Sequence, residues 1–192
     1  MAPVNLADLF QRFVGPREEP KLNLAFLDPL TRMPMRAAVV EELKHCLSKS
    51  HHKRPVALAI VDFSNVQGLV ETAAAGEGDL LMRLAKLMRS HVPEGHFIGH
   101  LRNREFAVIM CGSPIAEVEH LADSIIESVR SDESLQADRR YIATVVGIGY
   151  SSKGEGRAPQ LMTLADIALH YALATGRGSH TIVDRVPAAK AA

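Results

Sequence analysis

Apolar residues recur along the chain with two different spacings, and together these predict alternating helices and strands. Where they return every three or four positions, we expect amphipathic helices, over residues 5–14, 34–50, 80–88, 115–129 and 159–175. Alternating or continuous apolar runs bounded by turn residues predict strands over 56–63, 97–101, 105–111, 141–150 and 180–183. This order predicts an α+β fold in which helices pack against one sheet.

Several local signals refine these elements. The run 56–63 is apolar almost throughout and ends in a carboxylate, so we expect a strand buried on both faces. Only three residues separate the runs 97–101 and 105–111, which predicts a β-hairpin. Ser113 and Pro114 are typical of a helix cap followed by the first helical residue, and Gly176 is typical of a helix end.

Composition and charge exclude several classes of protein. A hydrophobic fraction of 47% is sufficient for a core in a chain of 192 residues, which excludes a disordered or fibrous protein. Lys plus Arg equals Asp plus Glu at 22 each, so we expect no nucleic-acid partner. The apolar stretch 56–61 is too short to cross a bilayer, and no secretory signal opens the chain. We therefore expect no membrane segment and a cytoplasmic location.

The cysteines and histidines offer little sign of a metal site. Cys46 and Cys111 are too few for a disulfide framework and lack metal-ligand spacing. His51 and His52 are adjacent, so their side chains diverge, and we interpret them as part of a basic helix end.

Six short motifs occur in an order and spacing typical of one known family. They are the segment 28–36, the strand ending in Asp62, the pair Gly78-Asp79, the pair Glu105-Phe106, the segment 146–149, and the segment 165–169 followed by Gly176-Arg177. Over about residues 27–183 the chain resembles bacterial diguanylate cyclase domains, known as GGDEF domains.

The resemblance implies a fold, a division of the chain and an activity. It implies a central, mostly antiparallel five-stranded sheet flanked by helices, with a ferredoxin-like core. The chain would then divide into an N-terminal amphipathic helix and linker (1–26), a GGDEF-like domain (27–185) and a flexible tail (186–192). No sensor, receiver or phosphodiesterase segment is expected on it. Active members join two GTP molecules into cyclic di-GMP, with carboxylates that hold Mg²⁺.

The signature that names the family is degenerate here. Its five positions read Arg102-Asn103-Arg104-Glu105-Phe106, so both glycines have acquired side chains; of these, Asn103 can still adopt positive φ. Arg104 stands where active relatives place an acid that serves as metal ligand and base, and an arginine cannot shed its proton for that role. One unit charge at 4 Å contributes about 4 kcal/mol at an effective dielectric of about 20, so this two-unit change is large. Asp62 and Glu105 match two other metal-binding positions, and our hypothesis is that the Arg104 guanidinium replaces the metal as their counter-ion.

Other positions also differ from the residues that active family members use to bind substrate or metal. Val70 and Gln67 replace an asparagine that reads guanine and a lysine, Ser64 replaces the second acid of the Asp-x-Asp motif, and Leu173 replaces a lysine. The product-inhibition motif Arg-x-x-Asp is absent from residues 93–96, so we expect no inhibitory site for cyclic di-GMP.

Two nucleotide-binding positions survive, and each has two interpretations. Asp79 matches the guanine-contacting aspartate of the family, but an acid in the first turn of a helix also favours the helix dipole. Arg177 matches a phosphate-binding arginine, but an arginine just after a helix end is often simply solvated.

We therefore predict a catalytically inactive, diguanylate-cyclase-like domain that acts as a regulatory protein–protein interaction module in bacterial signalling related to cyclic di-GMP. We expect no cofactor and neither Mg²⁺ nor GTP in the site. The expected partner is another signalling protein, with a homodimer as a further possibility, and the N-terminal helix, the basic end of the helix at 34–50 and the altered hairpin are the candidate surfaces. The alternative is a sensor that binds GTP without turnover, through Asp79 and either Arg104 or Arg177. A working cyclase with an unusual site is a third hypothesis.

Overall fold

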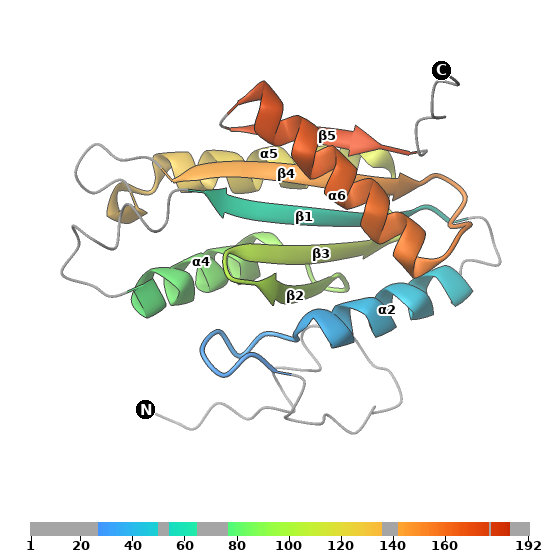
Figure 1. The fold of residues 1–192 in the computed structure, drawn as a ribbon, viewed down its shortest axis with the longest axis horizontal. Coiled ribbons are helices and arrows are strands. Elements are labelled where there is room, and N and C mark those ends of the chain that lie inside the picture. The colour runs from blue at the N-terminus through green and yellow to red at the C-terminus, as the bar shows by residue number, and fades with distance from the viewer. Residues whose placement is uncertain (1–26, 50–53, 65–76, 136–141, 177, 185–192) are drawn as a thin grey trace, which may run out of the picture.

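The structure is a computed structural model that describes residues 27–49, 54–64, 77–135, 142–176 and 178–184 (Figure 1). The predicted N-terminal helix at 5–14, the tail at 186–192 and the histidines His51 and His52 lie outside these ranges. The proposed domain boundaries stay predictions.

One five-stranded sheet forms the centre of the molecule (Figure 1). Its strands are β1 (Val56–Ser64), β2 (Phe97–Arg102), β3 (Glu105–Cys111), β4 (Ala143–Ser151) and β5 (Ser179–Val183). They lie in the order β2-β3-β1-β4-β5, and all neighbours are antiparallel except β4 and β5, which are parallel. The predicted α+β fold, with its hairpin and its mostly antiparallel five-stranded sheet, is confirmed.

Four helices cover the two faces of the sheet. They are α2 (Arg36–Lys49), α4 (Glu77–His91), α5 (Ile115–Ser131) and α6 (Ala158–Thr175), and a short 3₁₀ helix at Glu133–Leu135 follows α5. Side chains of α4 and α5 share one buried cluster with the sheet, and those of α2 and α6 share the other. In Figure 1, α6 crosses in front of the strands and α5 lies behind them. The molecule therefore has three layers, with the sheet in the middle.

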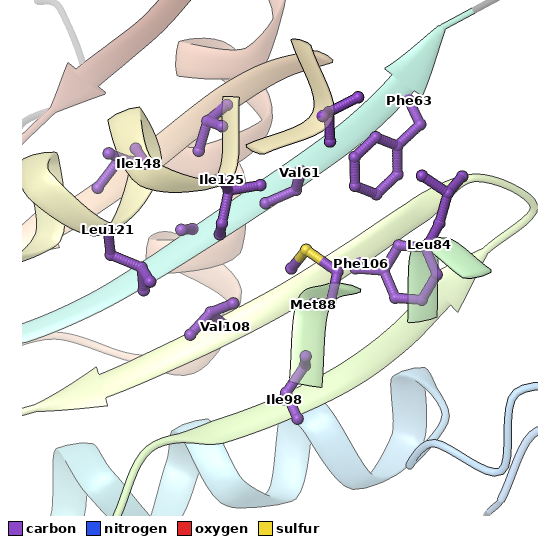
Figure 2. Packing of buried hydrophobic residues seen from close by; sticks show 14 of the residues in the cluster. Val61, Phe63, Leu84, Met88, Ile98, Phe106, Val108, Leu121, Ile125 and Ile148 are labelled. Carbon is purple, nitrogen blue, oxygen red and sulfur yellow. The ribbon is translucent and has the colours of Figure 1, made fainter. Parts of the chain in front are cut away.

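The position of strand β1 at the centre of the sheet explains why the run at 56–63 is apolar almost throughout. Successive side chains of a strand point to opposite faces, so a central strand between two helical layers must be apolar at every position. Val61 and Phe63 pack into the α4 and α5 cluster, with Phe106 beside Phe63 (Figure 2), whereas Leu58 and Ile60 pack into the α2 and α6 cluster. The prediction that this strand is buried on both faces is confirmed.

Two glycines of β4 allow α6 to lie directly on the sheet. A Cβ atom at Gly149 would lie 2.5 Å from the carbonyl oxygen of Leu161, and one at Gly147 would overlap the backbone of Leu169. Any larger residue would push the helix away, so the segment 146–149 sets the distance between β4 and α6.

The start of α5 differs from the prediction. Pro114 is the N-cap residue and Ile115 the first helical residue, and no side chain caps the helix. The Ile115 backbone instead hydrogen-bonds to Tyr150 on β4. Ser113 therefore does not serve as the cap, because the helix begins one residue later than predicted. Gly176 ends α6 with φ 120°, as predicted.

The two cysteines are joined. Cys46 on α2 and Cys111 at the end of β3 form a disulfide across 65 residues of sequence. Nothing in the local sequence predicts this bond, since only the tertiary packing of α2 beside β3 brings the two residues together. In the described part of the chain, none of the helices is both long and apolar enough to cross a membrane. The cytoplasmic location stays a prediction.

Candidate functional site

The β2–β3 turn places residues 102–106 at one edge of the sheet. Arg102 ends β2, Glu105 begins β3, and the two residues face each other across the strands. Asn103, in the turn between them, has φ 42°, which an asparagine tolerates better than most residues. The expectation that Asn103 adopts positive φ is confirmed, whereas Arg102 remains in the strand and avoids that conformation.

An ion pair closes this turn. Nε of Arg102 lies 2.9 Å from Oε2 of Glu105, whose side chain is 17% exposed. The hydrogen bond and charge of Glu105 raise the pKa of Arg102, and the charges of Asp166 and Asp62 add to that effect. Asp62 is also the direct partner of Glu105 in the pairing of β1 with β3. Arg102 thus lies in the field of three carboxylates from β1, β3 and α6.

Arg104 is not the residue that pairs with Glu105, so this part of the hypothesis needs correction. The guanidinium on Glu105 belongs to Arg102, because the two residues are cross-strand neighbours whereas Arg104 is in the turn. Arg104 is half-buried, and its carbonyl oxygen accepts a hydrogen bond of 3.3 Å from the Phe63 backbone. Over the described residues, Arg104 forms no ion pair, and no three His, Cys, Asp or Glu side chains are grouped as a metal ion would need.

A buried polar cluster supports the turn from behind. Asp28 Oδ1 accepts hydrogen bonds from the Thr31 amide at 2.6 Å and the Thr31 hydroxyl at 2.8 Å. Asp28 Oδ2 lies 3.4 Å from Nδ1 of His100, and Nε2 of His100 lies 3.0 Å from the carbonyl oxygen of Asn103. The His100 ring stacks on Phe106 with centroids 4.8 Å apart. The cluster therefore joins the loop at residues 28–33 to the carbonyl group of the turn.

The charge of Asp28 is stabilised by this cluster. Burial alone would raise the pKa of Asp28, but hydrogen bonds from Thr31 and the interaction with His100 lower it below its ordinary value. His100 was missed by the sequence analysis, although a histidine within a run of apolar strand residues is itself a signal of a buried polar contact.

Asp79 lies in the first turn of α4 and is accessible. Its Oδ2 is 2.9 Å from the guanidinium of Arg83, and its side chain is 44% exposed. Leu30 borders the same helix end, since a Cβ atom on Gly78 would lie 3.6 Å from its side chain. The position suits the helix dipole, so the structural interpretation of Asp79 has support, and its contact with guanine stays a prediction.

Of the remaining family positions, some lie within the residues that the structure describes and others lie outside them. Arg177, Val70 and Gln67 lie outside the described residues. Leu173, which replaces the family lysine, is 45% exposed on α6. Residues 93–96 form a turn in which the His96 amide donates to the Pro93 carbonyl at 3.3 Å.

Comparison with known families agrees with this arrangement. The sequence profile described as "Diguanylate cyclase, GGDEF domain" matches residues 25–179. The chain belongs to the GGDEF domain family. The family resemblance and the fold predicted from the motifs are thereby confirmed.

Curated relatives carry the GGDEF sequence within longer proteins. The chain is 27% identical over 166 residues to the probable diguanylate cyclase DgcE of Escherichia coli, a match that covers 84% of this chain and 15% of the relative. It is 26% identical over 149 residues to the E. coli diguanylate cyclase DgcP, with 76% of this chain and 44% of the relative covered. The chain thus spans less than half the length of either relative.

Solved GGDEF structures share the fold. The GGDEF domain of DgcB from Caulobacter crescentus, in complex with c-di-GMP, superimposes with a TM-score of 0.72 at 23% identity and covers 86% of this chain and 97% of that one. Diguanylate cyclase SiaD from Pseudomonas aeruginosa, in complex with its activator SiaC, gives a TM-score of 0.71 at 24% identity, with 83% and 62% covered. These likenesses establish the architecture around the hairpin.

Proposed function

We propose that this GGDEF domain does not synthesise cyclic di-GMP and instead acts as a regulatory protein–protein interaction module in bacterial signalling. The observation that carries the proposal is the bond between Arg102 and Glu105 beside Asp62, because it places a positive charge among the carboxylates that the family uses for metal.

The donor set at the hairpin does not suit Mg²⁺. A magnesium ion takes carboxylate oxygens and phosphate, but Glu105 is bonded to Arg102 and the third family acid is Arg104. Because Arg102 is 63% exposed, the ion pair itself is worth only about 0–1 kcal/mol. The opposition to a metal therefore comes from the positive charge of Arg102 beside the acids and from the absence of an acid at position 104, more than from the strength of one pair.

Synthesis would also lack a proton acceptor at the turn. The family position of the acid is occupied by Arg104, which stays protonated at any physiological pH. An arginine favours phosphate binding over deprotonation of a hydroxyl, so the turn suits contact with an anion or an acidic surface.

An interaction role fits the surface of the turn and its neighbourhood. Arg102 and Asn103 are exposed at the tip of the hairpin. Leu30 in the 28–33 loop and Met82 on α4 are 40% and 45% exposed. SiaD was solved in complex with an activator protein, so a GGDEF protein of this architecture can receive a protein partner. The partner proposed here is another signalling protein or a second copy of the chain.

A GTP sensor without turnover is the second candidate. Its support is the exposed carboxylate of Asp79 at the start of α4, together with arginines at the hairpin that could contact phosphate without a metal. Calorimetry with GTP, with and without Mg²⁺, separates the two functions. Binding in the micromolar range that is abolished by Asp79→Ala would favour the sensor.

The catalytic part of the proposal is tested with a product assay. Purified chain incubated with GTP and Mg²⁺ should yield no cyclic di-GMP by chromatography, under conditions in which an active GGDEF relative converts its substrate. Steady conversion would overturn the proposal. The interaction part requires either concentration-dependent dimerisation in sedimentation experiments or retention of one specific signalling protein from the host. If neither occurs, the interaction role is wrong.

A pair of variants tests the charge argument directly. Combining Arg102→Ala with Arg104→Asp removes both positive charges and returns the acid, so Mg²⁺-dependent GTP binding should become stronger than in the unmodified chain. The matched control is Arg130→Ala, which breaks the exposed pair of Arg130 with Glu127 on α5 and should leave binding unchanged. Equal binding by both variants would show that hairpin charge is not what excludes the metal.

A further inference from the structure

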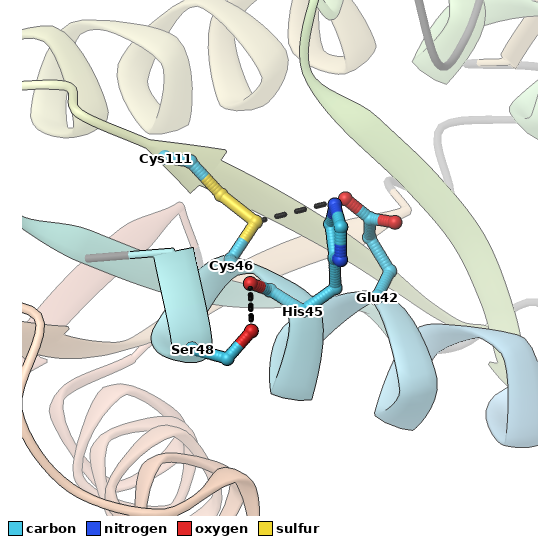
Figure 3. Close-up of a disulfide and its surroundings, with 5 residues drawn as sticks. All are labelled: Glu42, His45, Cys46, Ser48 and Cys111. Atoms are coloured by element: carbon cyan, nitrogen blue, oxygen red, sulfur yellow. Dashed lines mark hydrogen bonds between the residues drawn. A yellow bond between two sulfur atoms is a disulfide. The ribbon is translucent and has the colours of Figure 1, made fainter. Parts of the chain in front are cut away.

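The geometry points to a thiol–disulfide exchange site at Cys46 and Cys111, in which a small dithiol or a dithiol protein attacks the Cys111 sulfur and Cys46 leaves. The two residues join α2 to the end of β3, with Cα atoms 6.0 Å apart (Figure 3). That separation is the usual one for a disulfide. The inference concerns the end of β3 opposite the hairpin and does not depend on the proposed function.

The two cysteine residues differ in exposure. Cys46 is 5% exposed within the α2 and α6 cluster, whereas Cys111 is exposed at the end of its strand. An incoming thiolate must reach the sulfur that it attacks, so access selects Cys111. Disulfides with an exposed sulfur belong to the labile and regulatory kind more than to the structural kind.

The surroundings of the buried sulfur favour a neutral leaving thiol. Oε1 of Glu42, one helical turn before Cys46, lies 3.6 Å from the Cys46 sulfur. A thiolate released there faces a carboxylate, and the His45 ring lies at the same corner in Figure 3. Like charges disfavour each other, so Cys46 should take up a proton, and its S–H group can then donate a hydrogen bond to Glu42.

The exposed sulfur has the opposite surroundings. Arg54 borders the residue after Cys111, since a Cβ atom on Gly112 would lie 3.9 Å from its Cδ. The Gly112 amide donates to the Pro55 carbonyl at 2.7 Å, which holds this end of β3 against the start of β1. Because the cationic Arg54 side chain borders this end of β3, it favours a thiolate at Cys111, which is therefore also the nucleophile when the bond re-forms.

The exchange balances with a dithiol as co-reactant. One thiolate of the dithiol bonds to the Cys111 sulfur while the Cys46–Cys111 bond breaks, and Cys46 takes a proton from water. The second thiol of the dithiol loses its proton and attacks the mixed disulfide, which releases Cys111 as a thiolate. The dithiol is oxidised to its disulfide by two electrons, and the protein disulfide is reduced by the same two.

Reduction would release one end of a helix whose other end meets the hairpin cluster. Just before α2, the carbonyl oxygen of Pro34 accepts a 2.7 Å hydrogen bond from the amide of His100. The disulfide fixes the C-terminal part of α2 to β3. The redox state at Cys46 and Cys111 therefore sets how firmly α2 is held along the sheet.

Trapping compares the access and reactivity of the two cysteines, each left as a single thiol. Cys46→Ser and Cys111→Ser variants are each incubated with oxidised glutathione and followed by mass spectrometry. Adduct formation on Cys111, in the Cys46→Ser variant, should be at least about tenfold faster than on the buried Cys46. Equal rates, or faster modification of Cys46, would overturn the assignment. The unmodified chain gives a second test. If both of its cysteines can still be alkylated after incubation with oxidised glutathione, the two thiols do not form a disulfide and the assignment is wrong.

A charge variant tests the leaving group independently. Glu42→Gln should speed reduction of the full chain by dithiothreitol about threefold or more, because a leaving thiol of lower pKa departs faster. Glu41→Gln is the matched control, since Glu41 is 70% exposed and paired with Lys44, and it should leave the rate within about twofold. Equal rates for the two variants would rule out control by Glu42. The rates are read from thiol release, with circular dichroism to verify that each variant is folded.

Discussion

The two ends of strand β3 are held in different ways. At the hairpin, Glu105 forms one ion pair with the largely exposed Arg102, and at the other end Cys111 is bonded covalently to Cys46. Between the ends, residues 106–110 are buried without exception. The strand is fixed by its middle and by its disulfide end, so the charge of the turn can change without loss of the fold.

This difference is consistent with a fold that tolerates substitution at the turn. The chain keeps a TM-score of 0.72 against DgcB at 23% identity, so the packing of sheet and helices has been retained through extensive substitution. The hairpin side chains Arg102 and Asn103 contribute little to that packing, because they are exposed at its edge. The exposed residues of the turn are therefore distinct from the buried residues that hold the fold together.

Removing the disulfide at the end of β3 should lower the free energy of unfolding more than any other change. Cys111→Ser removes the cross-link across 65 residues and should lower the free energy of unfolding by about 4 kcal/mol, mainly because the unfolded chain gains freedom. Urea titration of the oxidised chain and the variant measures the difference. Reduced, unmodified chain is the control and should match the variant. An oxidised chain no more stable than Cys111→Ser would show that the bond does not stabilise the fold.

The sequence predicted the packed parts of β3 and its neighbours well. Residues 105–111 form the predicted strand, and the run at 56–63 lies in the centre of the sheet, as a continuous apolar segment requires. These predictions succeed because burial imposes a local pattern on the residues themselves. The motif at 146–149 was also informative, since its glycines permit the contact with α6.

The predictions failed where partners are distant in the sequence. The Cys46–Cys111 bond and the hydrogen bond between Ile115 and Tyr150 have no local signature. Arg104 was expected on Glu105, but cross-strand register gives that place to Arg102. Which side chain reaches a given acid depends on strand pairing, and composition and spacing do not determine it.

Disrupting the polar cluster behind the turn should lower the free energy of unfolding by an intermediate amount. Asp28→Asn removes a carboxylate that is 20% exposed and accepts three hydrogen bonds, so it should lower the free energy of unfolding by about 2 kcal/mol at neutral pH. Asp123→Asn is the matched control, because Asp123 also pairs with a histidine but is 66% exposed. Its cost should stay below about 1 kcal/mol.

The cost of Asp28→Asn should depend on pH. The pKa of Asp28 is lowered from its ordinary 3.8, so its stabilising effect is fully present above the unfolded value and is lost as the pH falls through the folded one. The difference between Asp28→Asn and the unmodified chain should therefore be constant near neutral pH and shrink below about pH 4. Urea titrations between pH 3 and 7 measure it. A difference that grows as the pH falls below about 4 would contradict the assignment of charge to Asp28.

Removing the ion pair at the turn should have the smallest effect. Arg102→Ala should change the free energy of unfolding by less than about 1 kcal/mol, because the arginine is 63% exposed and the bond is made largely in water. Arg130→Ala, which removes a comparable i,i+3 pair on α5, should change it by a similar amount in the same urea titrations. A loss of about 2 kcal/mol or more at Arg102 alone would mean that the pair supports the fold. In that case the separation of chemistry from packing along β3 would be wrong, and the arginine would have been retained for stability instead of for what the turn contacts.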